Sequence, residues 1–293
     1  MKLKKEYFLA SVSILCWSTV SVISKLLLNQ FTSMQILWIS SFFAFLFLLL
    51  YHLVTGRIRK LKEYRFKDFA KMASIGCLGT FWYYVFYYAG TDRMLASQAF
   101  IVNYLWPIMS IVFTCLVLKR RMTPKKIFAL ILSFAGVAVV VCGDLTSSNQ
   151  GVLLGSFCCF LGAVSYGLYT ALSQKYSYDR ALLLMLSYFA TFSLTSIWNF
   201  ARGELFLPKL LPSIGMAWNG IFTMALANIT WTAALNAGKP EKISNLAYIT
   251  PVMSLVWTSI VLREPFRLSN IIGFLIIILG IFIQLKDSPK QKK

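Results

Sequence analysis

The chain has 293 residues, of which 58% are hydrophobic and 13% charged, with a net charge of +19 and a mean hydropathy of +0.69. A water-soluble domain of this length needs more charge than this to coat its surface, so the composition indicates a membrane protein. The positive charge does not indicate nucleic-acid binding, because the Lys and Arg residues lie in short segments between apolar stretches.

A helix needs about 20 apolar residues to cross a bilayer. The first apolar stretch follows Lys2, Lys4 and Lys5, but it is too long for a signal peptide and lacks a small-residue cleavage site, so we read it as a permanent helix. We predict an all-α polytopic membrane protein with ten transmembrane helices, near residues 7–28, 34–54, 70–90, 94–118, 124–143, 151–174, 181–200, 213–236, 242–262 and 268–285. The third and fourth are separated only by the short polar run Gly90-Thr91-Asp92-Arg93.

The distribution of positive charge predicts the orientation. With a cytoplasmic N-terminus, 23 of the 29 Lys and Arg residues fall in inside segments, most densely in residues 56–71 and 119–126. Because cytoplasmic loops carry the excess of Lys and Arg, we expect a multi-pass protein of the plasma (inner) membrane with both termini in the cytoplasm.

The sequence also repeats itself. Tyr104–Leu118 and Tyr248–Leu262 share eight of fifteen residues at a constant spacing of 144, and Gly136 and Gly280 lie in the same register. This spacing is about half the chain, so we predict two five-helix repeats, residues 1–146 and 147–293. Since five is odd, equivalent helices cross the membrane in opposite directions, and such inverted repeats are typical of transporters that work by alternating access.

Groups that could carry catalysis are scarce in the predicted helices. All ten acidic residues fall at helix ends or in loops, the single histidine is His52, and the adjacent Cys158 and Cys159 are read as packing residues. We therefore expect no metal, no cofactor and no enzymatic activity. Without a carboxylate at mid-membrane depth, we expect facilitated diffusion rather than proton coupling, and Lys25 to reach the interface or a substrate carboxylate.

Prolines, glycines and aromatic residues indicate a cavity. Pro107 and Pro251 fall near the centres of their predicted helices, where we expect kinks that free backbone carbonyls; simple packing kinks are the alternative. The pairs Gly151/Gly155 and Gly76/Gly79 predict close helix contacts. Trp17, Trp106 and Tyr166 lie away from helix ends, where an interfacial belt explains them poorly, and such rings suit an apolar or aromatic solute.

The chain resembles the drug/metabolite transporter superfamily, specifically its EamA-type ten-helix carriers, and among them the YddG-type aromatic amino-acid exporters. The resemblance lies in Trp17-Ser18-Thr19, in Val102-Asn103-Tyr104-Leu105-Trp106-Pro107, and in Gly162-Ala163 with Tyr169 and Lys175-Tyr176. It implies a central cavity between the two halves and efflux of hydrophobic or aromatic amino acids and related metabolites. Where similar proteins commonly have Trp, this chain has Tyr166, which adds a hydroxyl to the expected cavity.

The combined prediction is an exporter of small organic metabolites with an aromatic-lined central cavity. Its expected partners are a small-molecule substrate and the lipid bilayer, not nucleic acid; a monomer is compatible with the sequence, which leaves the oligomeric state open. The alternatives are a lipid-handling protein or membrane-embedded enzyme, a channel, a scaffold, and a proton-coupled metabolite or drug exporter. The predicted substrate-binding residues are Trp17, Ser18, Tyr83, Tyr84, Asn103, Tyr104, Trp106, Tyr166, Tyr169, Asn228, Trp231 and Tyr248.

Overall fold

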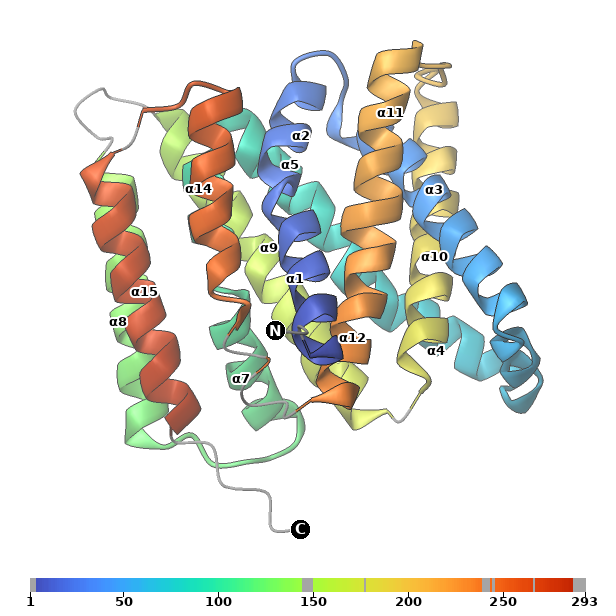
Figure 1. Ribbon diagram of the computed structural model, residues 1–293, viewed down its shortest axis with the longest axis horizontal. Helices are drawn as coiled ribbons and strands as arrows, with labels where there is room; N and C mark the ends of the chain where they lie inside the picture. The colour runs from blue at the N-terminus through green and yellow to red at the C-terminus, as the bar shows by residue number, and fades with distance from the viewer. Residues whose placement is uncertain are drawn as a thin grey trace.

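The computed structural model describes residues 4–143, 150–176, 178–238, 243, 246–265 and 267–286, and all regular structure in these ranges is helical (Figure 1). The helices form one bundle, with most helix ends at the upper or the lower face in the view of Figure 1. In chain order they are α1 (Lys5–Ser18), α2 (Val20–Leu28), α3 (Ser33–Val54), the 3₁₀ helix η1 (Arg57–Glu63), α4 (Phe66–Cys77), the π-helical turn η2 (Leu78–Trp82), α5 (Tyr83–Arg93), α6 (Ala96–Asn103), α7 (Trp106–Val117), α8 (Pro124–Cys142), α9 (Gln150–Lys175), α10 (Arg180–Ala201), α11 (Leu210–Trp218), the π-helical segment η3 (Asn219–Leu226), α12 (Ala227–Ala237), α14 (Ile249–Val261) and α15 (Leu268–Lys286).

Length and composition suit this bundle to a bilayer. Large apolar side chains such as Leu15, Ile131 and Phe200 are exposed on the outside, where lipid rather than water suits them. The fold is therefore that of an all-helical membrane protein. Among the described residues, seven helical stretches are long and apolar enough to span a membrane, namely Lys5–Leu28, Ser33–Val54, Ala96–Val117, Pro124–Cys142, Gln150–Lys175, Arg180–Ala201 and Leu210–Ala237, and Ile249–Val261 and Leu268–Ile283 are shorter apolar helices.

The polar run at 90–93 does not interrupt a helix as predicted. Helix α5 continues through Arg93, and the break falls at Met94 and Leu95. The Thr91 hydroxyl is satisfied within the helix, since its Oγ1 donates to the carbonyl of Tyr87 at 2.9 Å. Gly90 does not form a turn. It lets α5 approach α9 closely, since a side chain at this position would collide with Cys159 of α9.

The two prolines also lie differently from the prediction. Pro107 is in the first turn of α7, and the helix is already interrupted at Tyr104 and Leu105; Pro251 is the third residue of α14. Neither is a kink at the centre of a continuous helix. A proline is tolerated in a first turn because the N–H it lacks would have no helical partner there.

Backbone conformations recur at the spacing of the sequence repeat. Among the described residues, Lys119 and Arg263 are the non-glycine residues with positive φ, at 52° and 56°, and they stand 144 positions apart. Gly56 and Gly203 have φ values of 68° and 67°. Each of these four residues follows the end of a helix, where a left-handed residue caps the last carbonyls.

The two π-helical segments occupy corresponding places as well. η2 interrupts the α4–α5 stretch, and η3 interrupts the α11–α12 stretch. Gly76 and Gly220, again 144 residues apart, let these stretches approach their neighbours: a side chain at Gly76 would collide with Ser187 of α10, and one at Gly220 would collide with Ser40 of α3.

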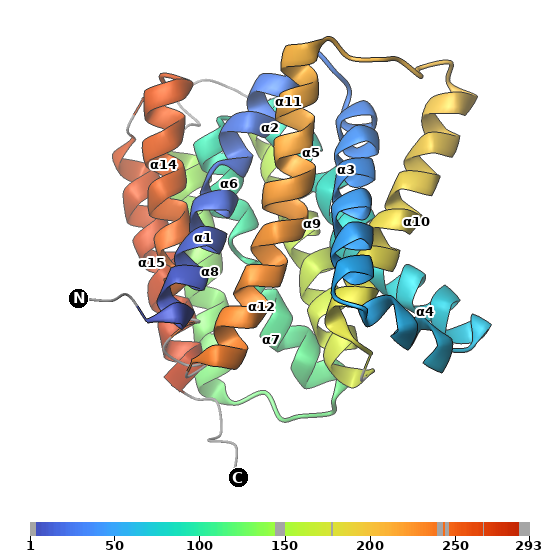
Figure 2. The same cartoon turned by 45° about the vertical axis from the view of Figure 1, so that its right-hand side comes forward.

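Helices α8 and α15 pack side by side in both views (Figure 1 and Figure 2). Glycines allow their backbones to come close. A side chain at Gly136 would collide with the carbonyl of Gly273, and a side chain at Gly280 would collide with Ser133. Between them, Ser133 Oγ donates to the carbonyl of Ile277 at 3.5 Å, and these two residues are themselves 144 positions apart.

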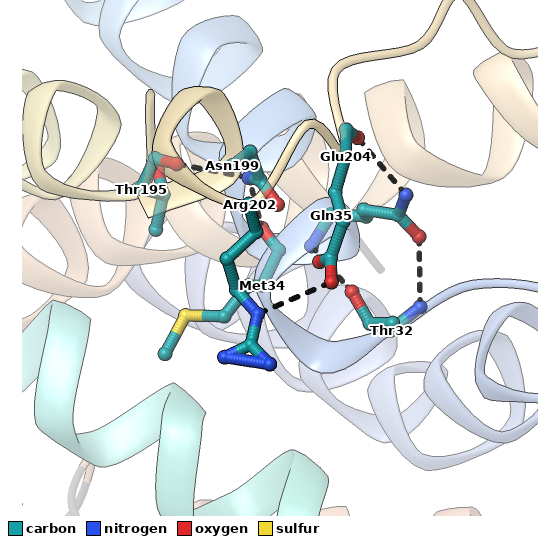
Figure 3. Close-up of polar contacts among 7 residues, drawn as sticks. All are labelled: Thr32, Met34, Gln35, Thr195, Asn199, Arg202 and Glu204. Atoms are coloured by element: carbon teal, nitrogen blue, oxygen red, sulfur yellow. Dashed lines mark hydrogen bonds and ion pairs between the residues drawn. The ribbon is translucent and has the colours of Figure 1, made fainter. Parts of the chain in front are cut away.

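Polar contacts tie the start of α3 to the end of α10 at the upper face (Figure 3). Gln35 Nε2 donates to the carbonyl of Glu204 at 3.1 Å, and Asn199 Nδ2 donates to the carbonyl of Met34 at 3.3 Å. Arg202 pairs with the Glu204 carboxylate at 3.3 Å. This end of the α3–α10 pair is therefore fixed by hydrogen bonds as well as apolar packing.

Candidate functional site

A cavity of about 100 Å³ lies in the middle of the bundle, with walls from both halves of the sequence. Nine of its lining residues are aromatic, so the cavity offers ring faces and edges to an apolar solute. The lining residues are Trp17, Val20, Gly79, Thr80, Tyr83, Tyr84, Phe100, Asn103, Tyr104, Trp106, Tyr166, Tyr169, Leu184, Tyr188, Asn228, Ala247 and Thr250.

Tyr166 of α9 contacts three other rings of this aromatic wall. Its ring centroid lies 5.1 Å from that of Tyr83, 5.1 Å from that of Trp106 and 5.6 Å from that of Tyr169. These separations and tilted or edge-on angles are those that aromatic pairs prefer. Tyr169 fits because η2 has Gly79 beneath its ring, where any side chain would collide.

Two buried polar atoms of cavity-lining residues have no hydrogen-bond partner among the described residues. Asn103 Nδ2 donates to Tyr83 Oη at 2.9 Å, but Asn103 Oδ1 is unpaired, as is Thr250 Oγ1. Both residues are only 3% exposed. A buried polar atom without a partner costs roughly 1–3 kcal/mol, so both atoms favour binding a solute or a water molecule.

A second, larger cavity of about 290 Å³ continues from the first, and we call it the vestibule. The two share Tyr166, Tyr169, Leu184 and Asn228, so these residues lie between the two cavities. The vestibule extends toward the lower face of Figure 1, where α9 ends and α10 begins. Its full lining is Tyr51, Arg57, Tyr166, Tyr169, Thr170, Ser173, Gln174, Arg180, Ala181, Leu184, Asn228, Ile229, Thr232, Ala233 and Asn236.

The opposite face is held together by Lys25, Glu264 and residues 91–97, which we call the end clamp. Lys25 Nζ donates to the carbonyls of Thr91 (2.7 Å), Asp92 (3.3 Å) and Met94 (3.0 Å). The Glu264 carboxylate accepts from the backbone N–H groups of Ala96 (2.6 Å) and Ser97 (3.0 Å). A cation thus satisfies the carbonyl end of α5 and an anion satisfies the N–H end of α6, the arrangement that helix dipoles favour.

Nine of the twelve predicted substrate-binding residues line the central cavity: Trp17, Tyr83, Tyr84, Asn103, Tyr104, Trp106, Tyr166, Tyr169 and Asn228. The other three lie outside the walls of both cavities. Ser18 accepts from Trp257 Nε1 at 3.0 Å and donates to the carbonyl of Leu15. Trp231 packs against the ring of Trp17 at 5.4 Å, and Tyr248 packs against Phe282 at 5.1 Å.

Several wall residues were missed by sequence reasoning. Tyr188 is of the same type as the predicted residues, but the sequence did not reveal which face of its helix turns inward. Arg57 and Arg180 belong to segments whose positive charge is already explained by membrane orientation. Gly76, Gly79 and Gly155 sit at close helix contacts, as predicted for packing, and Cys159 is buried while Cys158 is half-buried.

Comparisons with known proteins agree with this architecture. A curated protein of Archaeoglobus fulgidus described as an uncharacterized transporter is 25% identical over 237 residues, covering 77% of this chain and 80% of that protein. The aromatic amino acid exporter YddG of Salmonella typhimurium is 25% identical over 211 residues (66% and 68%), and YddG of Ancylobacter novellus is 24% identical over 190 residues (61% and 63%).

One solved crystal structure superposes with a TM-score of 0.67 and covers 97% of both chains at 18% identity, which shows a common fold. The EamA-like transporter family matches residues 4–142 and again 153–285, which together make up most of the chain. This chain therefore belongs to the EamA-like transporter family of the drug/metabolite transporter superfamily, and it is a multi-pass membrane transporter rather than an enzyme.

Proposed function

We propose that this transporter exports hydrophobic or aromatic amino acids and related small metabolites by alternating access. The observation that carries the proposal is the central cavity, whose nine aromatic rings continue into a polar vestibule on one face of the bundle. Ring faces bury the apolar part of such a solute, while Asn103 and Thr250 offer unpaired polar atoms that can orient it. The resemblance to proteins described as aromatic amino acid exporters supports the same substrate class.

The architecture that we propose is ten transmembrane helices in two inverted repeats, residues 1–146 and 147–293. The ten spans are the nine apolar helical stretches described above together with the continuous α4–η2–α5 stretch from Phe66 to Arg93. The matched left-handed residues Lys119 and Arg263, and the matched π-helical segments, support the repeat. Equivalent stretches run in opposite directions, as α8 and α15 do in Figure 1.

We infer that this conformation faces the cytoplasm and that both termini are cytoplasmic. The vestibule opens at the face that carries η1 and the 119–123 turn, the two most basic described segments. Basic segments accumulate in the cytoplasm. The end clamp then closes the outer face, and its release would admit the solute to the outside in the alternate state.

We further propose that transport is facilitated diffusion. The charged side chains on the described cavity walls are Arg57 and Arg180, which stay protonated throughout the physiological pH range. Proton coupling generally requires a group that changes its charge as the protein changes conformation. A proton-coupled metabolite exporter is the alternative mechanism on the same fold.

The proposed function is tested by counterflow in proteoliposomes that contain the purified protein. Vesicles loaded with one unlabelled amino acid are mixed with the same labelled amino acid outside, and the panel runs from Gly and Ala to Leu, Phe, Tyr and Trp. We expect exchange that increases with the size of the apolar side chain. Counterflow no greater than in empty liposomes for the whole panel would reject the proposal.

A further inference from the structure

We propose that the vestibule selects solutes that carry a carboxylate, and that their α-ammonium group is dispensable. This inference rests on the proposed function and narrows the substrate class of the same site. The expected substrates are aromatic carboxylic acids, including 2-hydroxy acids alongside amino acids, and not aromatic amines.

The first step of the argument is the charge of the vestibule. Arg57 of η1 and Arg180, the first residue of α10, both line it, and both side chains are exposed. Exposed guanidinium groups are charged at the opening of the vestibule. There they attract anionic solutes and raise the rate at which these solutes encounter the protein. The vestibule therefore presents two cationic groups to a solute arriving from the basic face.

Asp179 precedes Arg180 in the sequence and could neutralise it, but that carboxylate is already engaged. Asp179 Oδ2 pairs with Lys60 at 3.0 Å, and Oδ1 accepts from the backbone N–H groups of Ala181 and Leu182. These contacts outweigh the effect of partial burial, which opposes ionisation, and they hold the pKa of the Asp179 carboxyl below its usual value. The charge of Arg180 is thus left to act on the vestibule.

The second step concerns the central cavity, whose described walls are aromatic, aliphatic or neutral polar. An ammonium group placed there meets amide and hydroxyl oxygens, such as Asn103 Oδ1 and Thr250 Oγ1, rather than a carboxylate. A neutral hydroxyl can donate to only one of these oxygens at a time, whereas an ammonium can donate to both, but the hydroxyl loses far less hydration on burial. Because the described walls hold no carboxylate, the cavity does not require the ammonium group of an amino acid.

Aromatic walls also attract organic cations through their ring faces, which would favour amines. The vestibule favours carboxylates over amines, because an organic cation must pass both guanidinium groups before it reaches the rings. At physiological ionic strength the Debye length is about 8 Å, so these charges act across the mouth more than at the central cavity. We therefore expect these charges to change KM, and the dependence of KM on salt concentration, more than they change kcat.

The test uses three probes that share one ring: L-phenylalanine, 3-phenyllactate, which has a hydroxyl in place of the ammonium, and phenethylamine, which lacks the carboxylate. Uptake is measured in proteoliposomes with the membrane potential clamped at zero by valinomycin and equal potassium. We expect 3-phenyllactate to have a KM within about threefold of that of phenylalanine, because the neutral oxygens accept either substituent. The KM of phenethylamine should be at least about tenfold higher than that of phenylalanine, because the two guanidinium groups of the vestibule repel its ammonium group.

The charge is tested with the double variant R57Q/R180Q. At low ionic strength its KM for 3-phenyllactate should rise about tenfold with kcat within about twofold, and added salt should erase the difference from wild type. R57K/R180K, which keeps both charges, should retain the wild-type KM even if the Gln variant is poorly folded. Arg59→Gln is the matched control, because Arg59 is an exposed cation of η1 that does not line the vestibule.

Equal transport of phenethylamine and 3-phenyllactate would overturn the inference while leaving the proposed function intact. The same holds if R57Q/R180Q behaves like Arg59→Gln, or if R57K/R180K loses affinity as R57Q/R180Q does. If wild-type protein transports none of the three probes, this inference fails, and the proposed function fails with it only if no amino acid of the counterflow panel is exchanged either.

Discussion

Tyr104 Oη donates a 2.6 Å hydrogen bond to the carbonyl oxygen of Ala247, which lies just before the first turn of α14. Both residues line the central cavity, and they come from different repeats of the sequence. The oxygen also accepts from the N–H of Thr250 at 3.0 Å. A tyrosine from one half of the protein is therefore tied to the backbone that precedes α14 in the other half.

Removing the hydroxyl of Tyr104 should weaken this connection without removing the ring. We expect Tyr104→Phe to lower stability by about 1 kcal/mol, the typical net contribution of a hydrogen bond, and to lower counterflow of aromatic solutes. Tyr248→Phe is the matched control, since Tyr248 is the repeat equivalent that packs against Phe282 outside the cavity. Thermal unfolding in detergent and counterflow measure both effects, and equal losses in the two variants would contradict the role given to Tyr104.

The aromatic wall predicts a graded loss of solute affinity. Trp17→Ala, Tyr104→Ala and Trp106→Ala should each weaken solute binding by about 1–3 kcal/mol, because each removes ring surface from the cavity. Trp82→Ala should leave affinity unchanged, since Trp82 is 46% exposed and does not line the cavity. Binding is followed by isothermal calorimetry on folded protein; normal affinity in all three cavity variants would exclude the cavity as the solute site.

The end clamp predicts a shift in conformational balance. Lys25→Met leaves the carbonyls of Thr91, Asp92 and Met94 without their cation and should favour the state open at that face. The reporter is a cysteine at Val20, which lines the cavity, in a background without the six native cysteines. Labelling from outside by a membrane-impermeant thiol reagent should accelerate.

Glu264→Gln should act in the same direction as Lys25→Met, because it weakens the charge-assisted bonds to Ala96 and Ser97. Arg202→Gln breaks a polar pair on the same face without touching the clamp and should leave the labelling rate unchanged. Unchanged labelling in both clamp variants would show that these bonds stabilise the fold without controlling access.

Facilitated diffusion predicts that an imposed pH gradient alone does not concentrate a zwitterionic solute. The measurement is flux of phenylalanine in proteoliposomes with equal solute on both sides and a pH step across the membrane. Reproducible accumulation that an ionophore abolishes would establish proton coupling instead. A voltage step is the weaker test, because an anionic solute responds to voltage even in an uncoupled carrier.

The orientation predicts which face reacts from outside the cell. A cysteine at Leu207, which is 96% exposed between α10 and α11, should react with an impermeant reagent in intact cells. A cysteine at Tyr64, beside the basic η1, should react only after permeabilisation. Ser148 and Gln291, for which we expect outside and inside labelling respectively, lie outside the described residues. Outside labelling at Tyr64 would reverse the orientation.

The sequence predicted the helical membrane fold and most of the aromatic wall, because apolar runs and centrally placed rings leave a signal in the residue types themselves. It did not predict the end clamp, since Lys25 contacts backbone carbonyls, which carry no residue signature, 66 to 69 positions away. Ser18 was predicted to face the solute, but its hydroxyl is used by Leu15 and Trp257. Local hydrogen bonding of this kind depends on helix packing, which spacing in the sequence does not determine.

The contact between Ser133 and Ile277 has a consequence for the motion of the whole protein. Its two members are equivalent positions of the proposed repeats, so the contact lies on the axis that relates the two halves. In the proposed alternating-access motion, we expect a pair on that axis to keep its separation, and α8 and α15 to form the stationary pair about which the other helices turn. A substitution such as Gly136→Leu should therefore destabilise the inward-facing and outward-facing states to the same extent, lowering the amount of folded carrier without changing the ratio of the two states.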